Sequence, residues 1–278
     1  MPEGDTIFRA ARALDRALAG RTVTRFESVF PQLTRVDTDA PLRGRTIERV
    51  TSRGKHLLIW FSGDLVLRTH MRMNGSWHIY RPGERWRRPG HDMRIAIGTD
   101  AFEAIAFTVP IAEFNTASAL ERDLGEVGPD PLSETFDRAD AMRRLRDRGD
   151  VAIADALLDQ RAISGVGNVY KSEVLFAGGV SPFVPVRDLS DAALEKLLTL
   201  IVKFMRANVV DGTTAAIVTY SGFRRTTGRA DPSARLWVYG RAGKPCRRCG
   251  TPVQLAKQGP HARSTYWCAK CQSAVPQT

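Results

Sequence analysis

The chain has 278 residues, of which 43% are hydrophobic, and its 41 Lys and Arg against 30 Asp and Glu give a formal net charge of +11. No apolar run reaches the about 18 residues that a membrane helix needs, and no basic, apolar leader points to secretion, so we expect a cytoplasmic protein. The positive charge indicates a polyanion such as nucleic acid as partner, and no basic amphipathic helix with an aromatic face points to a membrane surface.

The first element that the sequence predicts is a helix over residues 6–19. Apolar residues recur there at helical spacing and form one stripe. Asp5 or Thr6 would cap this helix, and Gly20 would end it.

Ahead of this helix stand Met1, Pro2 and Glu3. Aminopeptidases remove Met before a small residue, which would leave Pro2 with a free secondary amine. Such an amine is a nucleophile that forms an iminium with an electrophilic carbon, and Glu3 would sit beside it to exchange a proton. The alternative is that proline is merely a common second residue.

From residue 21 to about residue 110 the pattern changes to short β-type runs separated by turns. Several strands at this spacing are typical of a sandwich or barrel. The expected strands are residues 22–26, 46–52, 56–61, 65–70, 76–80, 94–98 and 103–108, and residues 81–90 form a basic loop between two of them.

Two turns in this region carry candidate side chains. Lys55 follows Arg53 and Gly54 between two expected strands, where a fixed lysine would neutralise a phosphate near the nucleophile. Met73 lies in the loop after residue 70, where an apolar tip would wedge between bases and fill the gap left by an extruded nucleotide. The alternatives are a solvated hairpin lysine and a methionine that fills the core.

Helical signals dominate after the Gly128-Pro129-Asp130-Pro131 boundary. The expected helices are residues 136–147, 151–159, 169–177 and 192–208. The stretch 213–231 is rich in Thr, Gly and Arg and is expected to be a mobile loop. Its residues Tyr220, Phe223, Arg224 and Arg225 would stack on or grip a nucleotide, or belong to an ordinary loop.

Two glycines lie between two of these helices, in the segment 163–168. They allow a sharp turn and a close approach of backbone to a phosphate, and Asn168 opens the next helix, where the amides favour an anion. A helix pair with this turn reads the DNA backbone rather than the bases. The alternative is a glycine-rich helical hairpin with Asn168 as its N-cap.

The four cysteines form two Cys-x2-Cys pairs within 26 residues, at Cys246, Cys249, Cys268 and Cys271. This is zinc-ribbon spacing, and four thiolates leave no open position for a water, so we expect one structural zinc ion. Arg263 lies between the pairs, where a β-hairpin would present it at its tip to grip a phosphate or enter a groove. The alternative is an ordinary basic surface residue.

Five motifs occur in one order along the chain. They are Met-Pro-Glu-Gly at the start, residues 54–58 (GKHLL), residues 165–173 (GVGNVYKSE), residues 238–241 (VYGR) and the four-cysteine ribbon. Together they resemble the formamidopyrimidine-DNA glycosylase / endonuclease VIII family over residues 2 to about 272. The start Met-Pro-Glu-Gly-Asp-Thr resembles the endonuclease VIII-like branch.

The resemblance implies an α+β multidomain fold. Residues 1–125 would form an N-terminal helix and an antiparallel β-sandwich with the catalytic residues. Residues 126–235 would form a helical domain with a helix-two-turn-helix, and residues 236–278 a C-terminal zinc ribbon with a β-hairpin.

The resemblance also implies a bifunctional DNA glycosylase and apurinic/apyrimidinic-site lyase of base excision repair. Pro2 corresponds to the nucleophile that attacks C1′ of the damaged nucleotide, and Glu3 to the acid that assists sugar opening. Lys55 corresponds to a lysine that contacts phosphate and supports base loss. Asn168 and Arg263 correspond to residues that grip the backbone, and Glu173 lies in the motif after the glycine turn as a further DNA-binding candidate.

The implied chemistry is a Schiff base followed by β,δ-elimination, with no catalytic metal or organic cofactor. The expected partner is damaged double-stranded DNA, bound by a monomer that associates with the bacterial nucleoid when it acts. Residues 99–125 lack the Arg-Arg-Phe-Gly string of the 8-oxoguanine branch, which favours oxidised pyrimidines as substrates. A preference for 8-oxoguanine or formamidopyrimidine by the same mechanism, and a non-catalytic module that binds damaged DNA, are the alternatives.

One departure concerns the void-filling residues. Some endonuclease VIII enzymes use a Gln-Leu-Tyr wedge, whereas this loop reads Met71-Arg72-Met73. The identity of the wedge residues and the opposite-base preference therefore do not transfer directly.

Overall fold

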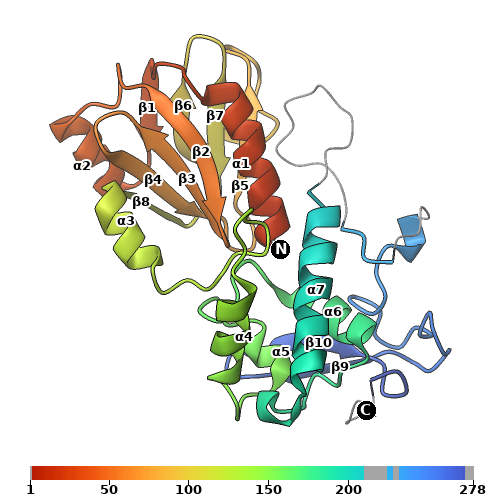
Figure 1. The fold of residues 1–278 in the computed structure, drawn as a ribbon. Helices are drawn as coiled ribbons and strands as arrows, with labels where there is room; N and C mark the ends of the chain where they lie inside the picture. Colours follow the sequence, from red (N-terminus) through yellow and green to blue (C-terminus); the bar gives the residue numbers. More distant parts are fainter. Residues whose placement is uncertain (1, 210–223, 228–231, 273–278) are drawn as a thin grey trace. The chain divides into compact units, whose positions relative to one another are not determined.

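The computed structural model describes residues 2–209, 224–227 and 232–272. Contacts divide these residues into two compact units, one up to residue 126 and the other from residue 127 onward. Figure 1 shows the elements of each unit. In the described ranges no helix is both long and apolar enough to cross a membrane.

The first unit begins with helix α1 (Gly4–Leu18), which starts two residues earlier than the apolar stripe predicts. Glu3 occupies the N-cap position with extended backbone, so Asp5 and Thr6 lie in the first turn instead of capping it. The apolar stripe is buried against the strands, and α1 packs mainly on β2. The chain after Leu18 turns through Gly20, whose φ is +78°.

Two four-stranded antiparallel sheets follow. One has the order β2-β3-β4-β8 and the other β1-β6-β7-β5. Their strands are β1 (Arg25–Ser28), β2 (Ile47–Arg53), β3 (His56–Phe61), β4 (Leu65–His70), β5 (Ser76–Tyr80), β6 (Met93–Gly98), β7 (Glu103–Phe107) and β8 (Ile111–Asn115). Buried residues of both sheets, among them Ile59, Leu67, Ile97 and Ala106, belong to one core with α1, so this is the expected sandwich.

Three elements of this unit are absent from the sequence prediction. Helix α2 (Pro31–Asp39) packs on β1 and β8, and helix α3 (Ala117–Leu124) packs on β4. Strand β8 pairs with β4 from Val66↔Asn115 to His70↔Ile111. Helix α2 buries a single residue, Leu33, so it carries almost no apolar stripe that a sequence pattern would reveal.

The second unit is mainly helical. It contains α4 (Arg138–Arg146), α5 (Ile153–Ala156), α6 (Asn168–Gly178) and α7 (Asp191–Ala207), together with short 3₁₀ turns at Val186–Asp188 and Pro232–Ala234. Helix α6 packs on α7 and α5, and α4 packs on α7. Helix α5 ends three residues before the expected bound of 159.

The end of the second unit is an antiparallel hairpin of β9 (Gln254–Gln258) and β10 (Arg263–Trp267). Its strands lie between the two Cys-x2-Cys pairs, as expected. The hairpin packs on α6 through β10, and Phe176 of α6 shares a small core with Val238, Val253 and two of the cysteines. The ribbon therefore belongs to the same compact unit as the helices, and a separate domain for residues 236–278 stays a prediction.

The side chain of Asn208, directly after α7, bonds both backbone groups of Arg225. Its Nδ2 donates to the Arg225 carbonyl at 2.9 Å, and its Oδ1 accepts from the Arg225 N–H at 2.8 Å. Of the expected loop 213–231, residues 224–227 are described, and the Arg224 guanidinium lies 5.5 Å from the centre of the Tyr170 ring. Tyr220 and Phe223 lie outside the described residues.

Candidate active site and DNA-binding residues

Pro2 and Glu3 are both buried at the start of α1. The Glu3 carbonyl accepts hydrogen bonds from Thr6 N–H at 2.9 Å and Ile7 N–H at 3.1 Å, which fixes the backbone of residue 3. The Glu3 side chain makes no capping bond to the helix. The start of the helix thus holds the proline next to a carboxyl group that is not used as a cap.

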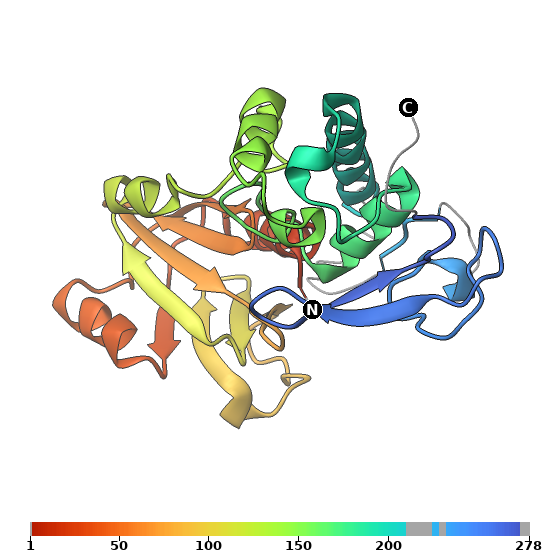
Figure 2. The same ribbon diagram turned by 90° about the horizontal axis from the view of Figure 1, so that it is seen from below.

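Lys55 lies in the two-residue turn that joins β2 to β3, where Arg53 pairs with His56. Gly54 takes the first central position with φ of +59°, as a type II′ hairpin turn requires. Lys55 is half-buried, so it is held rather than freely solvated. Figure 1 shows β2 and β3 as neighbouring strands of the first unit, and Figure 2 shows the same ribbon from below.

Two histidines accompany Lys55, and sequence reasoning assigned neither of them a role. The His56 and His70 rings meet edge to face at 5.2 Å. Burial and the positive charge of Arg72 and Lys55 lower the pKa of His70 to about 4, and burial together with His70 lowers the pKa of His56 to about 3. Both rings are therefore neutral at pH 7. The antiparallel register is the signal for this pair, because β3 and β4 bring the two histidines to one end of the sheet.

The loop after His70 is a tight turn that separates two methionines. The Met71 side chain is fully buried, whereas Met73 is 59% exposed at the tip. Gly75 closes the turn by donating to the Met71 carbonyl at 2.9 Å, and a Cβ at position 75 would lie 2.5 Å from that oxygen. The exposed residues are therefore Arg72, Met73 and Asn74, so Met73 lies at an exposed tip, whereas Met71 is a core residue.

Arg72 in this loop and Thr108 beside it have backbone φ angles that are unusual for non-glycine residues. Arg72 has a φ of +49°, and Thr108, whose hydroxyl donates to the Asn74 carbonyl at 2.7 Å, has a φ of +48°. The Arg72 N–H donates to Nδ1 of His70 at 3.0 Å. Non-glycine residues adopt this region rarely, and such strain persists where the surrounding structure enforces it. The tip that presents Met73 is therefore fixed from both sides.

In the second unit, Gly165 and Gly167 shape the turn before α6. Gly165 has a φ of +82°, its N–H bonds the Gln160 side chain at 3.0 Å, and Gln160 Nε2 returns a bond to the Val166 carbonyl. Gly167 is the N-cap, so Asn168 is the first residue of the helix and not its cap. The buried Oδ1 of Asn168 has no hydrogen-bond partner among the described residues. A buried amide oxygen without a partner is costly, and only a donor group can satisfy it.

Arg263 is exposed at the first position of β10, directly after the turn that contains Ala262 at φ of +47°. It lies opposite Gln258 in the hairpin. The structure thus presents this arginine at the tip end of the ribbon, as the sequence predicts.

Glu173 lies in the interior of the second unit and not on a surface that could contact DNA. It is fully buried, and its carboxylate accepts bonds from the N–H groups of Trp237, Val238 and Tyr239 at 2.7–2.9 Å and from the Thr226 hydroxyl. Burial raises the pKa of Glu173, and these hydrogen bonds oppose that shift. The carboxylate holds the chain before the ribbon in place and does not face a DNA surface.

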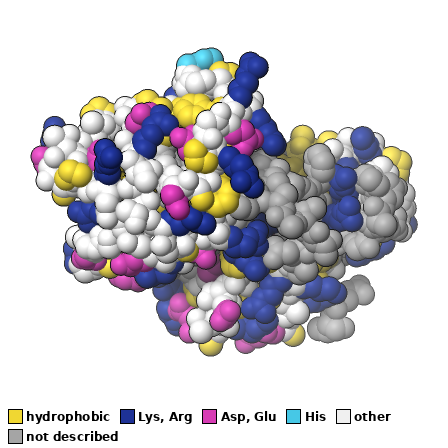
Figure 3. All heavy atoms as spheres, turned by 90° about the horizontal axis from the view of Figure 1, so that it is seen from above, with side chains coloured by type: hydrophobic (Ala, Val, Ile, Leu, Met, Phe, Trp, Pro, Cys, Tyr) yellow, Lys and Arg dark blue, Asp and Glu magenta, His cyan; other side chains and the backbone are white. Residues whose placement is uncertain are grey.

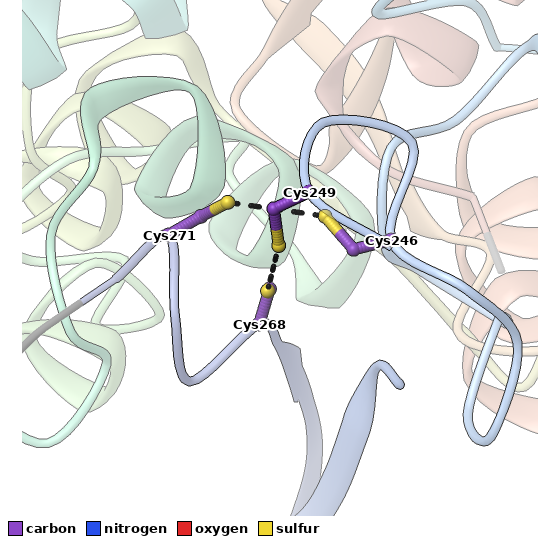
Figure 4. Close-up of side chains that lie close together, drawn as sticks. All are labelled: Cys246, Cys249, Cys268 and Cys271. Atoms are coloured by element: carbon purple, nitrogen blue, oxygen red, sulfur yellow. Dashed lines mark hydrogen bonds between the residues drawn. The ribbon is translucent and has the colours of Figure 1, made fainter. Parts of the chain in front are cut away.

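The four cysteine sulfurs point toward one another (Figure 4). All four lie within 4.8 Å of one another, with Sγ distances of 3.9 Å for Cys246–Cys271 and 3.5 Å for Cys249–Cys268. Tetrahedral zinc with Zn–S bonds of about 2.3 Å requires sulfurs about 3.8 Å apart. The donor set and spacing therefore fit a closed, structural zinc site.

Lys and Arg side chains occur over much of the face in Figure 3, but they differ in how they are paired. On α4, Arg143 and Arg144 bond Asp140, and Arg146 bonds Asp191. In the β5–β6 loop, the exposed Arg81, Arg85 and Arg87 make no ion pair with any described residue. Positive charge left unpaired in this way is available to an external anion.

Comparison with known proteins connects these features. The formamidopyrimidine-DNA glycosylase N-terminal domain model matches residues 1–110, and the H2TH domain model of the same enzyme matches residues 127–219. A zinc finger found in FPG and IleRS matches residues 243–274. The chain belongs to the formamidopyrimidine-DNA glycosylase / endonuclease VIII family. It is accordingly a DNA glycosylase and apurinic/apyrimidinic-site lyase of base excision repair, a DNA-binding enzyme with a zinc finger.

Relatives extend this likeness over the full chain. The chain is 42% identical to the probable endonuclease 8 2 of Streptomyces coelicolor, with 98% of this chain and 94% of the relative covered. It is 38% identical to the DNA-(apurinic or apyrimidinic site) lyase Nei2 of Mycolicibacterium smegmatis, with 99% and 100% covered. The Lactococcus lactis Fpg, in complex with DNA that contains N7-benzyl-Fapy-dG, has the same fold with a TM-score of 0.80 at 24% identity, over 98% and 100% of the two chains.

Proposed function

We propose that this enzyme excises oxidised pyrimidines from damaged duplex DNA and then cuts the strand, with Pro2 as nucleophile. The observation that carries the proposal is the buried pair of Pro2 and Glu3 at the start of α1, where the Glu3 side chain makes no capping bond. A carboxyl group in this position is able to exchange a proton beside an amine nucleophile.

The first step requires removal of Met1, because an acylated Pro2 nitrogen cannot form an iminium. The free amine attacks C1′, the C1′–base bond breaks and the base leaves with the bonding electron pair. The nitrogen then loses its proton. Protonation of O4′ by Glu3 opens the sugar and leaves a positively charged iminium at C1′. Lys55, held in the β2–β3 turn, neutralises a phosphate beside this centre.

The iminium then serves as an electron sink. It acidifies the C2′ proton, whose loss expels the 3′ phosphate by β-elimination, and a second elimination expels the 5′ phosphate. Water finally hydrolyses the iminium and frees the Pro2 amine. Every step uses the amine, carboxyl groups and water, so the proposed reaction takes place with no catalytic metal or organic cofactor.

The proposed grip on DNA comes from both units. Asn168 and Arg263 bind the backbone around the lesion, since the Asn168 amide N–H groups can donate to a phosphate at the start of α6 and Arg263 is an exposed arginine at a hairpin tip. Met73, the exposed tip of a rigid loop, fills the space left by the flipped nucleotide. We propose that the enzyme acts as a monomer on the nucleoid in the bacterial cytoplasm.

The preference for pyrimidines is supported by the sequence rather than the fold. The 42% identical relative is named an endonuclease 8, and residues 99–125 lack the Arg-Arg-Phe-Gly string. The fold does not discriminate between the two substrate classes, because structures of Lactococcus lactis Fpg include complexes with DNA that contains N7-benzyl-Fapy-dG and with DNA that contains an oxidised pyrimidine. A formamidopyrimidine-DNA glycosylase of Gloeobacter violaceus, 34% identical over 82% of this chain, favours the oxidised-purine alternative.

The test is borohydride trapping of Met1-processed protein on matched duplexes with thymine glycol or 8-oxoguanine. We expect a covalent adduct with thymine glycol that maps to the peptide containing Pro2, and a much lower yield of adduct for Pro2→Gly, which should still bind an abasic-analogue duplex. An adduct with 8-oxoguanine alone would show that the enzyme prefers oxidised purines. An adduct at another residue would refute the assignment of Pro2 as the nucleophile.

A further inference from the structure

Lys171 is fully buried on α6, which is unusual for a lysine. Its ammonium donates to the Ser264 carbonyl at 3.1 Å and to the Thr265 hydroxyl at 2.8 Å, both on β10. The side chain therefore reaches from the helix into the backbone of the ribbon hairpin. A buried ammonium is stable only where such partners exist, so its place in the fold is strongly determined.

The contacts of Lys171 extend across the hairpin. The Thr265 hydroxyl donates to Oε1 of Gln258, and Nε2 of Gln258 donates to the Pro182 carbonyl at 3.1 Å. Burial raises the pKa of Asp155, while the charge of Lys171 and a hydrogen bond from Gln258 oppose that shift, which places all three groups in one network.

The turn of the hairpin is fitted to the same network. A Cβ at Gly259 would lie 2.3 Å from Oδ1 of Asp155, so the turn approaches α5 as closely as a glycine allows. The Tyr266 N–H also donates to the Ser172 hydroxyl of α6 at 3.4 Å. Several buried polar contacts, rather than apolar packing alone, thus fix the hairpin on the helices.

The hydrogen-bond network of Lys171 lies between Asn168 and Arg263, the two residues that we propose bind the DNA backbone. Lys171 follows Asn168 by three positions on α6, so the two lie on the same side of the helix. Its partners Ser264 and Thr265 directly follow Arg263, and Gln258 is the residue paired with Arg263 across the hairpin. One buried ammonium therefore connects the start of α6 with the base of the Arg263 tip.

We propose that Lys171 is a positioning residue that fixes Arg263 relative to Asn168, so that both bind the DNA backbone as one preorganised unit. Preorganisation of this kind raises affinity because the groups are not ordered at the moment of binding. The inference rests on the proposed function in one respect, namely that Arg263 contacts DNA.

A double-mutant cycle tests the proposal, with affinity for a duplex carrying a tetrahydrofuran abasic analogue as readout. In the otherwise unchanged protein, Arg263→Ala should weaken binding roughly 10- to 100-fold. In a Lys171→Met background, Arg263→Ala should weaken binding by less than about threefold, because the arginine is no longer held in position. Lys171→Arg, which retains the charge and donors, should restore most of the Arg263 effect.

The matched control is Lys257→Met. Lys257 belongs to the same hairpin and donates to the Ser264 hydroxyl at 3.0 Å, but it is exposed. The full effect of Arg263→Ala should persist in this background. Zinc content and thermal unfolding are measured for every variant. If Lys171→Met loses zinc, the cycle is made with Thr265→Val, which removes one acceptor of the ammonium and leaves the lysine in place.

The outcomes separate the two levels of inference. Equal effects of Arg263→Ala with and without Lys171, in variants that retain zinc, would overturn the positioning role and leave the DNA contact of Arg263 intact. If Arg263→Ala has no effect even in the unchanged protein, the proposed DNA contact itself is wrong and the positioning role falls with it.

Discussion

The two units of this enzyme hold their candidate residues by different means. In the first unit, Lys55 and Met73 stand on short turns at the ends of strands, and the strands are fixed by an apolar core shared by both sheets and α1. In the second unit, the ribbon that carries Arg263 has a small apolar core, and it is joined to α6 by buried polar groups and contains the four-cysteine site. We therefore expect the strands of the first unit to withstand the loss of a single polar group better than the ribbon of the second unit.

The largest expected effect comes from the four-cysteine site, and it tests whether a zinc ion stabilises the ribbon of the second unit. Cys268→Ser should release zinc and unfold the ribbon, because a structural zinc site contributes folding free energy directly. DNA binding should fall strongly, while amides of the first-unit strands keep their protection against hydrogen exchange. Elemental analysis and hydrogen exchange measure the two parts. Native protein without zinc would contradict the assignment, and so would global loss of protection.

Substitutions of Met71 and Met73 form a matched pair that tests the contribution of the apolar core to the stability of the first unit. Met71→Ala should lower the free energy of unfolding by about 2–5 kcal/mol, because it leaves a cavity in the core. Met73→Ala should change it by no more than about 0.5 kcal/mol and instead slow base excision. Denaturant titration and single-turnover excision separate these effects. Equal stability losses would show that the tip is not the free wedge described above.

Lys55→Ala distinguishes a role in base excision from a role in DNA binding. We expect base excision to slow roughly 10- to 100-fold, with a smaller effect on the cutting of a pre-formed abasic site. Asn168→Ala should reduce both reactions alike, since it weakens binding of either substrate. Lys203→Ala, an exposed lysine on α7, is the control and should change neither rate. Equal losses in both reactions for Lys55→Ala would count against its assigned role in base loss.

A further test concerns the pH dependence of the stability of the first unit. His56 and His70 have pKa values of about 3 and 4 in the folded protein, so the unfolded chain binds more protons as pH falls below about 6.5. The free energy of unfolding should therefore fall between pH 6.5 and 4, by about 1.4 kcal/mol per pH unit for each histidine. His70→Gln should flatten this slope in denaturant titrations, whereas His91→Gln, at an exposed side chain, should not. An unchanged slope in His70→Gln would refute the assignment.

The same contrast explains what could be predicted from the sequence. Strands β3, β4 and β5 have the expected bounds, because their apolar runs are bordered by turn residues. Cysteine spacing and motif order gave the metal site and the family. Helix α2 and strand β8 were missed because each buries a single residue, Leu33 and Ala112.

Long-range polar contacts limit how much of the candidate site could be predicted from the sequence. Lys171 bonds residues 93 and 94 positions away, and Glu173 bonds residues 64 to 66 positions away, so no local pattern contains these partners. The sequence therefore placed Glu173 among the DNA-binding residues, although its carboxylate is enclosed. The sequence also could not separate Met71 from Met73, since neighbouring positions in a tight turn differ completely in exposure.

The two bonds between the Asn208 side chain and the backbone of Arg225 have a practical consequence for protein engineering. They join two positions that are 17 residues apart in the chain, so they fix Arg225 directly against the end of α7. An engineered variant should therefore retain Asn208, whose side-chain amide supplies both the donor and the acceptor that these two bonds require.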